Sequence, residues 1–182
     1  MRVSRQAKVA SMTVVVLRRC YHDPHSRAEI QEGDMSNLSG FTELELMIGN
    51  MYGEARLVEG DLSDDIREYL AIGCVVMNRV KSSGFPSTIK GVILAPKQFS
   101  WTNAGDPSRD KVIAFLSTKQ PSETYQRLKT YAQAIIDGNA EDFSKGADHY
   151  VARWLYEREK KQAWINKMKI TAIYGGHVFL KS

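Results

Sequence analysis

Cysteine is scarce in this sequence, and long apolar runs are missing. The 182 residues include only two cysteines, Cys20 and Cys74, and neither belongs to a CxxC pair, so a disulfide framework is excluded. The best candidate for a membrane segment, residues 12–17, is far shorter than the roughly 18 apolar residues of a spanning helix. It is also shorter than the apolar core of a secretory signal. With 43% apolar and 25% charged residues, the chain has ordinary globular composition, and we expect it to be made in soluble form in the cytoplasm.

Motifs for metal, nucleotide or serine-nucleophile chemistry are also missing. No HExxH, GxSxG, P-loop or GxGxxG pattern occurs. His149 and His177 stand outside any zinc-binding spacing, and a short run of Cys20, His22 and His25 lies in a poorly patterned region. RNA-binding aromatic motifs and zinc-finger spacings do not occur either. The sequence therefore predicts no metal, no cofactor and no nucleic-acid partner.

Positive charge is concentrated at the C-terminal end. The chain has a formal net charge of +4, and residues 151–182 hold seven Lys or Arg against two Asp or Glu, a local charge of +5. Such a run is most often a solvated helix face, and a polyanion partner is the functional alternative. We expect electrostatic contact with an anionic envelope and no stable membrane insertion.

The apolar pattern predicts a mainly α domain with a small β-hairpin. Residues 1–40 are poorly patterned and form an N-terminal arm, a candidate for disorder, whereas residues 41–182 form one domain. Thr42 and Glu45 make a capping box in front of a helix at 43–54. Further predicted elements are helices at 63–80, at 87–94 with Ser87 as its cap, at 121–137 and at 154–168, an irregular stretch at 96–107, and a hairpin at 172–180.

Glu54 is the strongest candidate for a catalytic group. It stands at the end of the first predicted helix, near the edge of that helix's apolar stripe. Partial burial there raises the pKa of a carboxyl and keeps it protonated near neutral pH, as a general acid requires. The alternative is a surface glutamate in the last turn of a helix.

Polar and aromatic residues also occur in other segments, where the packing of a domain does not require polar side chains. Such residues are typical of a sugar-binding site, because sugar rings stack on aromatic rings and their hydroxyls need polar partners. Each also has a structural interpretation, for example Trp101 as a core residue or His177 as a buried structural histidine. The candidate substrate-binding residues are Arg56, Asn78, Arg79, Gln98, Phe99, Trp101, Thr102, His149, Tyr150 and His177.

Taken in order, several short blocks resemble the SleB-type cell wall hydrolases, from about residue 43 to 180. The blocks are YGEAR at 52–56, VMNRV at 76–80, FPSTI at 85–89, QFSWT at 98–102, GADHY at 146–150 and GGHVF at 175–179, with Trp164 and Met168. The resemblance implies a fold similar to lysozyme and lytic transglycosylase domains, and it places the family's catalytic acid at Glu54. The chain departs from the family pattern at Leu57-Val58, and nearby Glu59 and Asp61 are candidates for electrostatic support.

The resemblance implies cleavage of the MurNAc–GlcNAc β-1,4 bond of peptidoglycan by a lytic transglycosylase. One glutamate then serves as acid and as base, which fits the lack of a convincing second carboxylate. The alternatives are a hydrolytic muramidase, an N-acetylmuramoyl-L-alanine amidase and a non-catalytic glycan-binding module. We expect a monomeric bacteriophage or prophage endolysin, made in the host cytoplasm without a signal peptide and acting on the cell wall.

Overall fold

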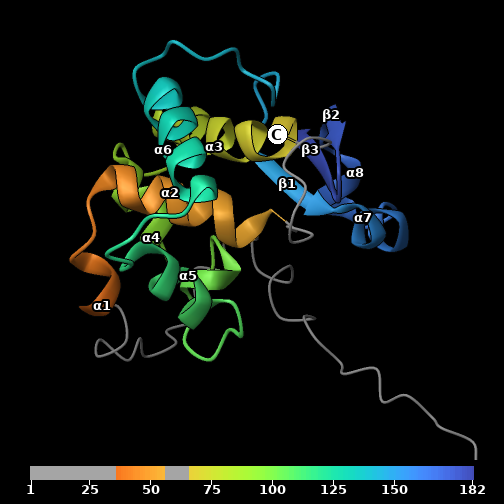
Figure 1. Cartoon of the computed structure of the whole chain (residues 1–182). Coiled ribbons are helices and arrows are strands. Elements are labelled where there is room, and N and C mark those ends of the chain that lie inside the picture. The colour runs from red at the N-terminus through yellow and green to blue at the C-terminus, as the bar shows by residue number, and fades with distance from the viewer. Residues whose placement is uncertain (1–35, 56–65) are drawn as a thin grey trace, which may run out of the picture.

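The computed structural model describes residues 36–55 and 66–182, which form a helical body with a small sheet at one side (Figure 1). The helices are α1 Ser36–Ser39, α2 Glu43–Glu54, α3 Ile66–Val80, α4 Ile89–Leu94, α5 Arg109–Leu116, α6 Glu123–Ile136, α7 Arg153–Glu159 and α8 Ala163–Asn166, with a 3₁₀ turn, η1, at Ser100–Thr102. The strands are β1 His149–Ala152, β2 Lys169–Tyr174 and β3 His177–Lys181. None of the described helices has the length and apolar content needed to cross a membrane.

The predicted helices are largely confirmed. Helix α2 begins after a capping box, in which the Thr42 amide donates to Glu45 Oε2 over 2.7 Å and the Glu45 amide donates to Thr42 Oγ1 over 3.2 Å. Helix α6 ends before Gly138, whose φ of +73° suits the residue after a helix. The predicted cap of α4 was wrong by one residue, because Thr88 rather than Ser87 accepts the hydrogen bond from the Gly91 amide.

Two predictions at the C-terminal end need correction. The hairpin is confirmed, but β1 pairs with its second strand and makes an antiparallel sheet of order β1-β3-β2. The predicted helix at 154–168 is two short helices, α7 and α8, separated by a turn in which the Gln162 amide donates to Glu159 O over 2.8 Å. Each helix buries one apolar residue of its own, Leu155 and Ile165.

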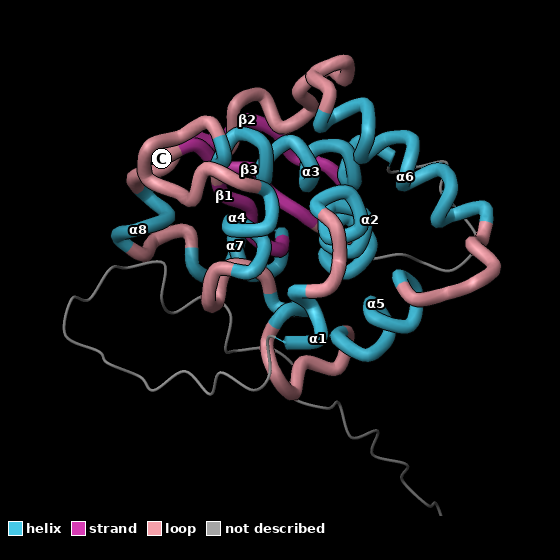
Figure 2. The backbone as a smooth tube through the Cα atoms, turned by 90° about the vertical axis from the view of Figure 1, so that its left-hand side faces the viewer, coloured by secondary structure: helices cyan, strands magenta, loops and turns pink. Residues whose placement is uncertain are grey.

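Helix α2 is the centre of the domain. It contacts α3, α4, α5 and α6, and Figure 2 shows these helices around it, with the sheet on the far side of α3. Leu46, Met47, Ile48 and Met51 of α2 are fully buried. The described end of the N-terminal arm also reaches this core, because Leu38 of α1 is fully buried. The division of the chain at residue 40 stays a prediction.

The C-terminal half of α2 depends on glycine for close packing. A Cβ on Gly53 would lie 2.9 Å from Val112 Cγ2 and 3.0 Å from Trp101 Cγ. Helix α5 and η1 can therefore approach α2 closely only because residue 53 has no side chain. This close approach brings η1 to Glu54, the neighbour of Gly53.

We expect Gly53→Ala to lower the free energy of unfolding by about 1 kcal/mol. Overpacking a tight core costs about 1–3 kcal/mol. This cost exceeds the roughly 1 kcal/mol that alanine gains over glycine in a helix. Chemical denaturation measures the change. Gly84→Ala is the control, since nothing lies within 4 Å of a Cβ there. Equal stabilities of the two variants would contradict the packing argument.

Candidate active site

The Glu54 carboxyl lies where the end of α2 meets η1 and β1. Its Oε1 accepts hydrogen bonds from the Ser100 amide over 3.0 Å and from Ser100 Oγ over 3.3 Å. Its Oε2 accepts one from the Tyr150 hydroxyl over 3.1 Å. Both carboxyl oxygens are thus held by donors from segments distant in the sequence.

The environment of Glu54 favours its protonated form. Burial raises the pKa of this carboxyl above its usual range. The positive charge of His177 and the hydrogen bonds from Tyr150 and Ser100 act in the opposite direction, because they stabilise the carboxylate. The net effect is a raised pKa, the direction that a general acid requires.

Tyr150 is presented by β1 and enclosed by other rings. Its ring contacts Phe99 at a centroid distance of 6.4 Å, Phe179 at 5.8 Å and His177 at 5.2 Å, the last in an edge-to-face arrangement. Burial and the neighbouring Glu54 raise the pKa of Tyr150 well above its usual value. Tyr150 therefore keeps its proton and acts as a hydrogen-bond donor.

The loop that carries Ser100 is anchored by buried side chains. Trp101 is fully buried, and its Nε1 donates to Asn50 Oδ1 of α2 over 3.0 Å. Phe99 and Thr102 are also buried. The expectation that these three loop residues contact substrate does not fit the structure, because they have almost no exposed surface. They fix the position of Ser100 instead.

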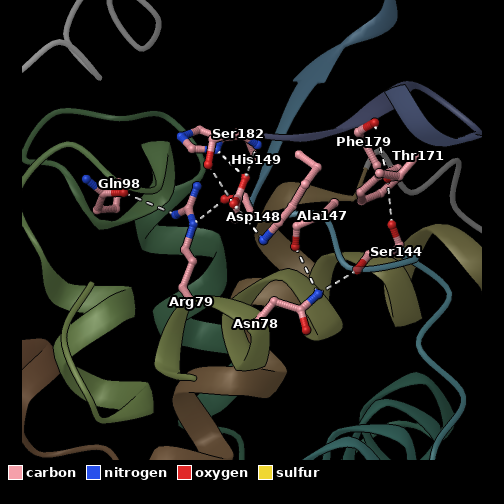
Figure 3. Close-up of polar contacts among 11 residues, drawn as sticks. Asn78, Arg79, Gln98, Ser144, Ala147, Asp148, His149, Thr171, Phe179 and Ser182 are labelled. Carbon is pink, nitrogen blue, oxygen red and sulfur yellow. Dashed lines mark hydrogen bonds and ion pairs between the residues drawn. The ribbon is translucent and has the colours of Figure 1, made fainter. Parts of the chain in front are cut away.

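Arg79 connects the loop to the sheet. Its guanidinium lies between the rings of Phe85 and Phe99, 5.1 and 5.2 Å from their centroids. Nε donates to Asp148 O over 2.6 Å, and a terminal nitrogen donates to Gln98 Oε1 over 3.1 Å (Figure 3). Arg79 is buried, so it positions both sides of the site and offers little surface to a substrate.

Asn78 secures the turn before β1. Its Nδ2 lies within hydrogen-bond distance of Ser144 Oγ at 3.0 Å and Ala147 O at 2.9 Å (Figure 3). It also lies 3.2 Å from Asp142 Oδ2. Burial acts to raise the pKa of Asp142, but hydrogen bonds from Ser144, Gly146 and Asn78 outweigh it and lower the pKa. In this arrangement the Asn78 side chain holds the turn before β1 in place, and its role in substrate binding stays a prediction.

His149 and the chain end share one buried acid. Asp148 Oδ1 lies 2.7 Å from His149 Nδ1, and its Oδ2 accepts a hydrogen bond from Ser182 Oγ over 2.8 Å. Lys181 Nζ lies 3.0 Å from the same carboxylate. Burial lowers the pKa of His149, so its neutral form is favoured. Of the predicted substrate-binding residues, Gln98, Asn78, His149 and Tyr150 keep some exposed surface.

His177 is buried and bound to an acid that the sequence did not reveal. Its Nδ1 lies 2.5 Å from Glu68 Oε1, and the same oxygen accepts a hydrogen bond from the Gly176 amide over 2.9 Å. Glu68 looked like an ordinary acid in the first turn of a helix. Ser100 was likewise missed, although it stands within the QFSWT block. Only the fold brings Glu68 and Ser100 to the site.

Three of the candidate residues, Arg56, Glu59 and Asp61, lie outside the described residues. Within residues 36–55 and 66–182, no group of three or more His, Cys, Asp or Glu side chains is placed to hold a metal ion.

A central helix that ends at a carboxyl with a raised pKa, packed among helices beside a small antiparallel sheet, defines a lysozyme-like domain. Comparison with protein families agrees with this class: the model of the Cell Wall Hydrolase family matches residues 63–180. The chain belongs to this family, and the resemblance to SleB-type hydrolases found in the sequence is confirmed. The matched region begins after Glu54 and does not include it.

Curated relatives and solved structures are consistent with this assignment. A spore cortex-lytic enzyme of Bacillus cereus is 34% identical over 146 residues, 76% of this chain and 44% of the relative. One of Oceanobacillus iheyensis is 30% identical over 87 residues, 44% of this chain and 29% of the relative. The chain thus spans less than half the length of these relatives.

Two solved catalytic domains show the same fold. The catalytic domain of the Bacillus cereus SleB protein superimposes with a TM-score of 0.54 and 25% identity, covering 86% of this chain and 99% of that domain. The catalytic domain of the germination-specific lytic transglycosylase SleB from Bacillus anthracis gives a TM-score of 0.53 and 26% identity, covering 84% and 100%. The predicted fold class is therefore confirmed.

The hydrogen bond from Tyr150 to Glu54 makes a direct prediction. Tyr150→Phe keeps the ring but removes a donor that stabilises the carboxylate, so the pKa of Glu54 should rise further. Titration of the Glu54 side-chain carboxyl by ¹³C NMR measures this change. Tyr156→Phe is the control for loss of a hydroxyl elsewhere. A pKa of Glu54 that stays constant or falls in Tyr150→Phe would contradict the assigned hydrogen bond.

Proposed function

We propose that this chain cleaves the glycan strands of peptidoglycan at the MurNAc–GlcNAc β-1,4 bond, as a lytic transglycosylase. The observation that carries the proposal is the Glu54 carboxyl, whose pKa burial raises while Ser100 and Tyr150 bind both of its oxygens. Family membership and the spore cortex-lytic relatives support a glycan of the cell wall as substrate.

In the first step, protonated Glu54 donates its proton to the glycosidic oxygen between MurNAc C1 and GlcNAc C4. The C1–O bond breaks, and the GlcNAc residue leaves with a hydroxyl at C4. Glu54 becomes a carboxylate, and the Ser100 and Tyr150 donors are in place to stabilise it. The same donors that moderate the raised pKa in the free protein thus assist the release of the proton.

In the second step, the Glu54 carboxylate acts as base. It takes the proton from the C6 hydroxyl of MurNAc as that oxygen attacks C1, and the product carries a 1,6-anhydro ring. Glu54 is protonated again and ready for another cycle. No water is consumed, so one carboxyl suffices for both steps.

The groups around Glu54 support the lytic route over hydrolysis. Standard retaining and inverting glycosidases use a second carboxylate as nucleophile or base. In the described part of the chain, Glu54 interacts with Ser100, Tyr150 and His177, while Glu68 is engaged by His177 and Gly176. A hydrolytic muramidase would draw its second acid from the region that holds Glu59 and Asp61.

The biological setting stays a prediction from the sequence. It comprises a monomeric endolysin of bacteriophage or prophage origin, synthesis in the host cytoplasm, and attraction of the basic C-terminal region to an anionic envelope. The exposed side chain of Lys161 supports the last of these, because it can approach a polyanion from solvent. Lys160 is also exposed but is paired with Glu157 over 2.6 Å.

Digestion of purified peptidoglycan with the wild type should release anhydro-muropeptides, which mass spectrometry detects. Glu54→Gln should release them on the order of 10²–10⁴-fold more slowly or not at all, because glutamine cannot donate the proton. Reducing muramic ends from the wild type would indicate a hydrolytic muramidase. Free stem peptides with intact glycan would indicate an amidase, and an unaltered polymer that retains the protein would indicate a binding module.

A further inference from the structure

The buried pair of Glu68 and His177 lies beside Tyr150, which donates a hydrogen bond to Glu54. The side chains of Glu68 and His177 are only 4% and 7% exposed, and their contact is 2.5 Å long. A buried acid and a buried imidazole each cost free energy unless they are paired, and here each is the partner of the other. Glu68 and His177 therefore form a specific pair in the interior of the domain.

The pair connects four elements at one point. Glu68 belongs to α3 and also fixes the turn between β2 and β3 through the Gly176 amide. His177 begins β3 and meets the Tyr150 ring edge-to-face, with an interplanar angle of 84° and a centroid distance of 5.2 Å. Tyr150 on β1 then donates to Glu54 at the end of α2. A shift of Glu68 would therefore also change the positions of His177, Tyr150 and the hydrogen bond to Glu54.

We propose that Glu68 is a positioning residue of the active site, which holds the His177 ring beside Tyr150 and Glu54 so that one carboxyl can act first as acid and then as base. This inference rests on the function proposed above and concerns how the same site works. Glu68 touches neither Glu54 nor the substrate in this account. It acts through His177 and Tyr150.

The charges around Glu54 explain why such a pair is useful. Burial raises the pKa of Glu54, and a carboxyl that holds its proton too tightly would be a poor acid in the first step. The electrostatic interaction with His177 acts against burial and lowers that pKa. The titratable or charged groups that act on this part of the site are Glu54 on α2, Glu68 and Arg79 on α3, Tyr150 on β1 and His177 on β3.

The test compares the pH dependence of muropeptide release for the wild type, Glu68→Gln and His177→Gln. Glu68→Gln keeps an oxygen for the Gly176 amide but removes the negative charge that is paired with His177, so the contact that holds the His177 ring is weakened. Release falls at high pH, where Glu54 loses its proton. In His177→Gln this fall should move to higher pH, because the electrostatic interaction with His177 that lowers the pKa of Glu54 is lost. In Glu68→Gln it should move in the same direction, because His177 is no longer held beside Tyr150 and Glu54.

The double variant Glu68→Gln/His177→Gln should shift the profile no further than His177→Gln alone, because Glu68 acts on Glu54 only through His177. Glu123→Gln is the matched control, since Glu123 also stands in the first turn of a helix but is exposed. It should leave the profile of the wild type unchanged. Thermal melting establishes that each variant is folded, and if Glu68→Gln does not fold, His177→Gln decides.

A second readout does not require activity. Proton NMR of the wild type should show a strongly downfield imidazole N–H resonance from the short contact between His177 Nδ1 and Glu68, and His177→Gln should lack it. Absence of this resonance from the folded wild type, or a profile of folded His177→Gln that matches the wild type or shifts to lower pH, overturns the inference. If the wild type releases no muropeptides at all, the proposed function fails instead, and the NMR signal alone tests the pair.

Discussion

Two hydrogen-bond donors that reach Glu54 from distant parts of the chain are the constraint on which the rest of the site depends. The Ser100 amide comes from η1 and the Tyr150 hydroxyl from β1, whereas Glu54 itself ends the central helix. The position of each donor depends on how firmly the segment that carries it is anchored. The buried polar contacts of the domain are therefore concentrated where those two segments are anchored.

Arg79 shows how a buried charge is used for this purpose. It binds Gln98 on the loop and the Asp148 carbonyl at the start of β1, so one side chain sets the distance between the two donor segments. The contact between Trp101 and Asn50 anchors the loop to α2 in the same way. Burial of these polar groups is costly, and Asn50 Nδ2 has no hydrogen-bond partner among the residues that the structure describes. The cost is consistent with a site that needs fixed geometry more than maximal stability.

Local patterns allowed much of the fold to be predicted from the sequence. The capping box at Thr42 and Glu45 and the apolar stripe behind it give the bounds of α2, and Gly138 marks the end of α6. Strand β1 could not be predicted in this way, because its four residues gain their structure by pairing with β3. Glu54 was found as a candidate because its position on an amphipathic helix is a local property. The pairing of Glu68 with His177 joins residues 109 positions apart, and no local pattern reports such a contact.

The central claim is that one carboxyl, Glu54, performs both proton transfers and that the sugar's own hydroxyl takes the place of water. Digestion of purified peptidoglycan in H₂¹⁸O, followed by mass spectrometry of the released fragments, tests this most directly. A lytic reaction consumes no water, so the account predicts anhydro ends without ¹⁸O. One ¹⁸O atom at C1 of each new muramic end would contradict it and would require a second group that activates water.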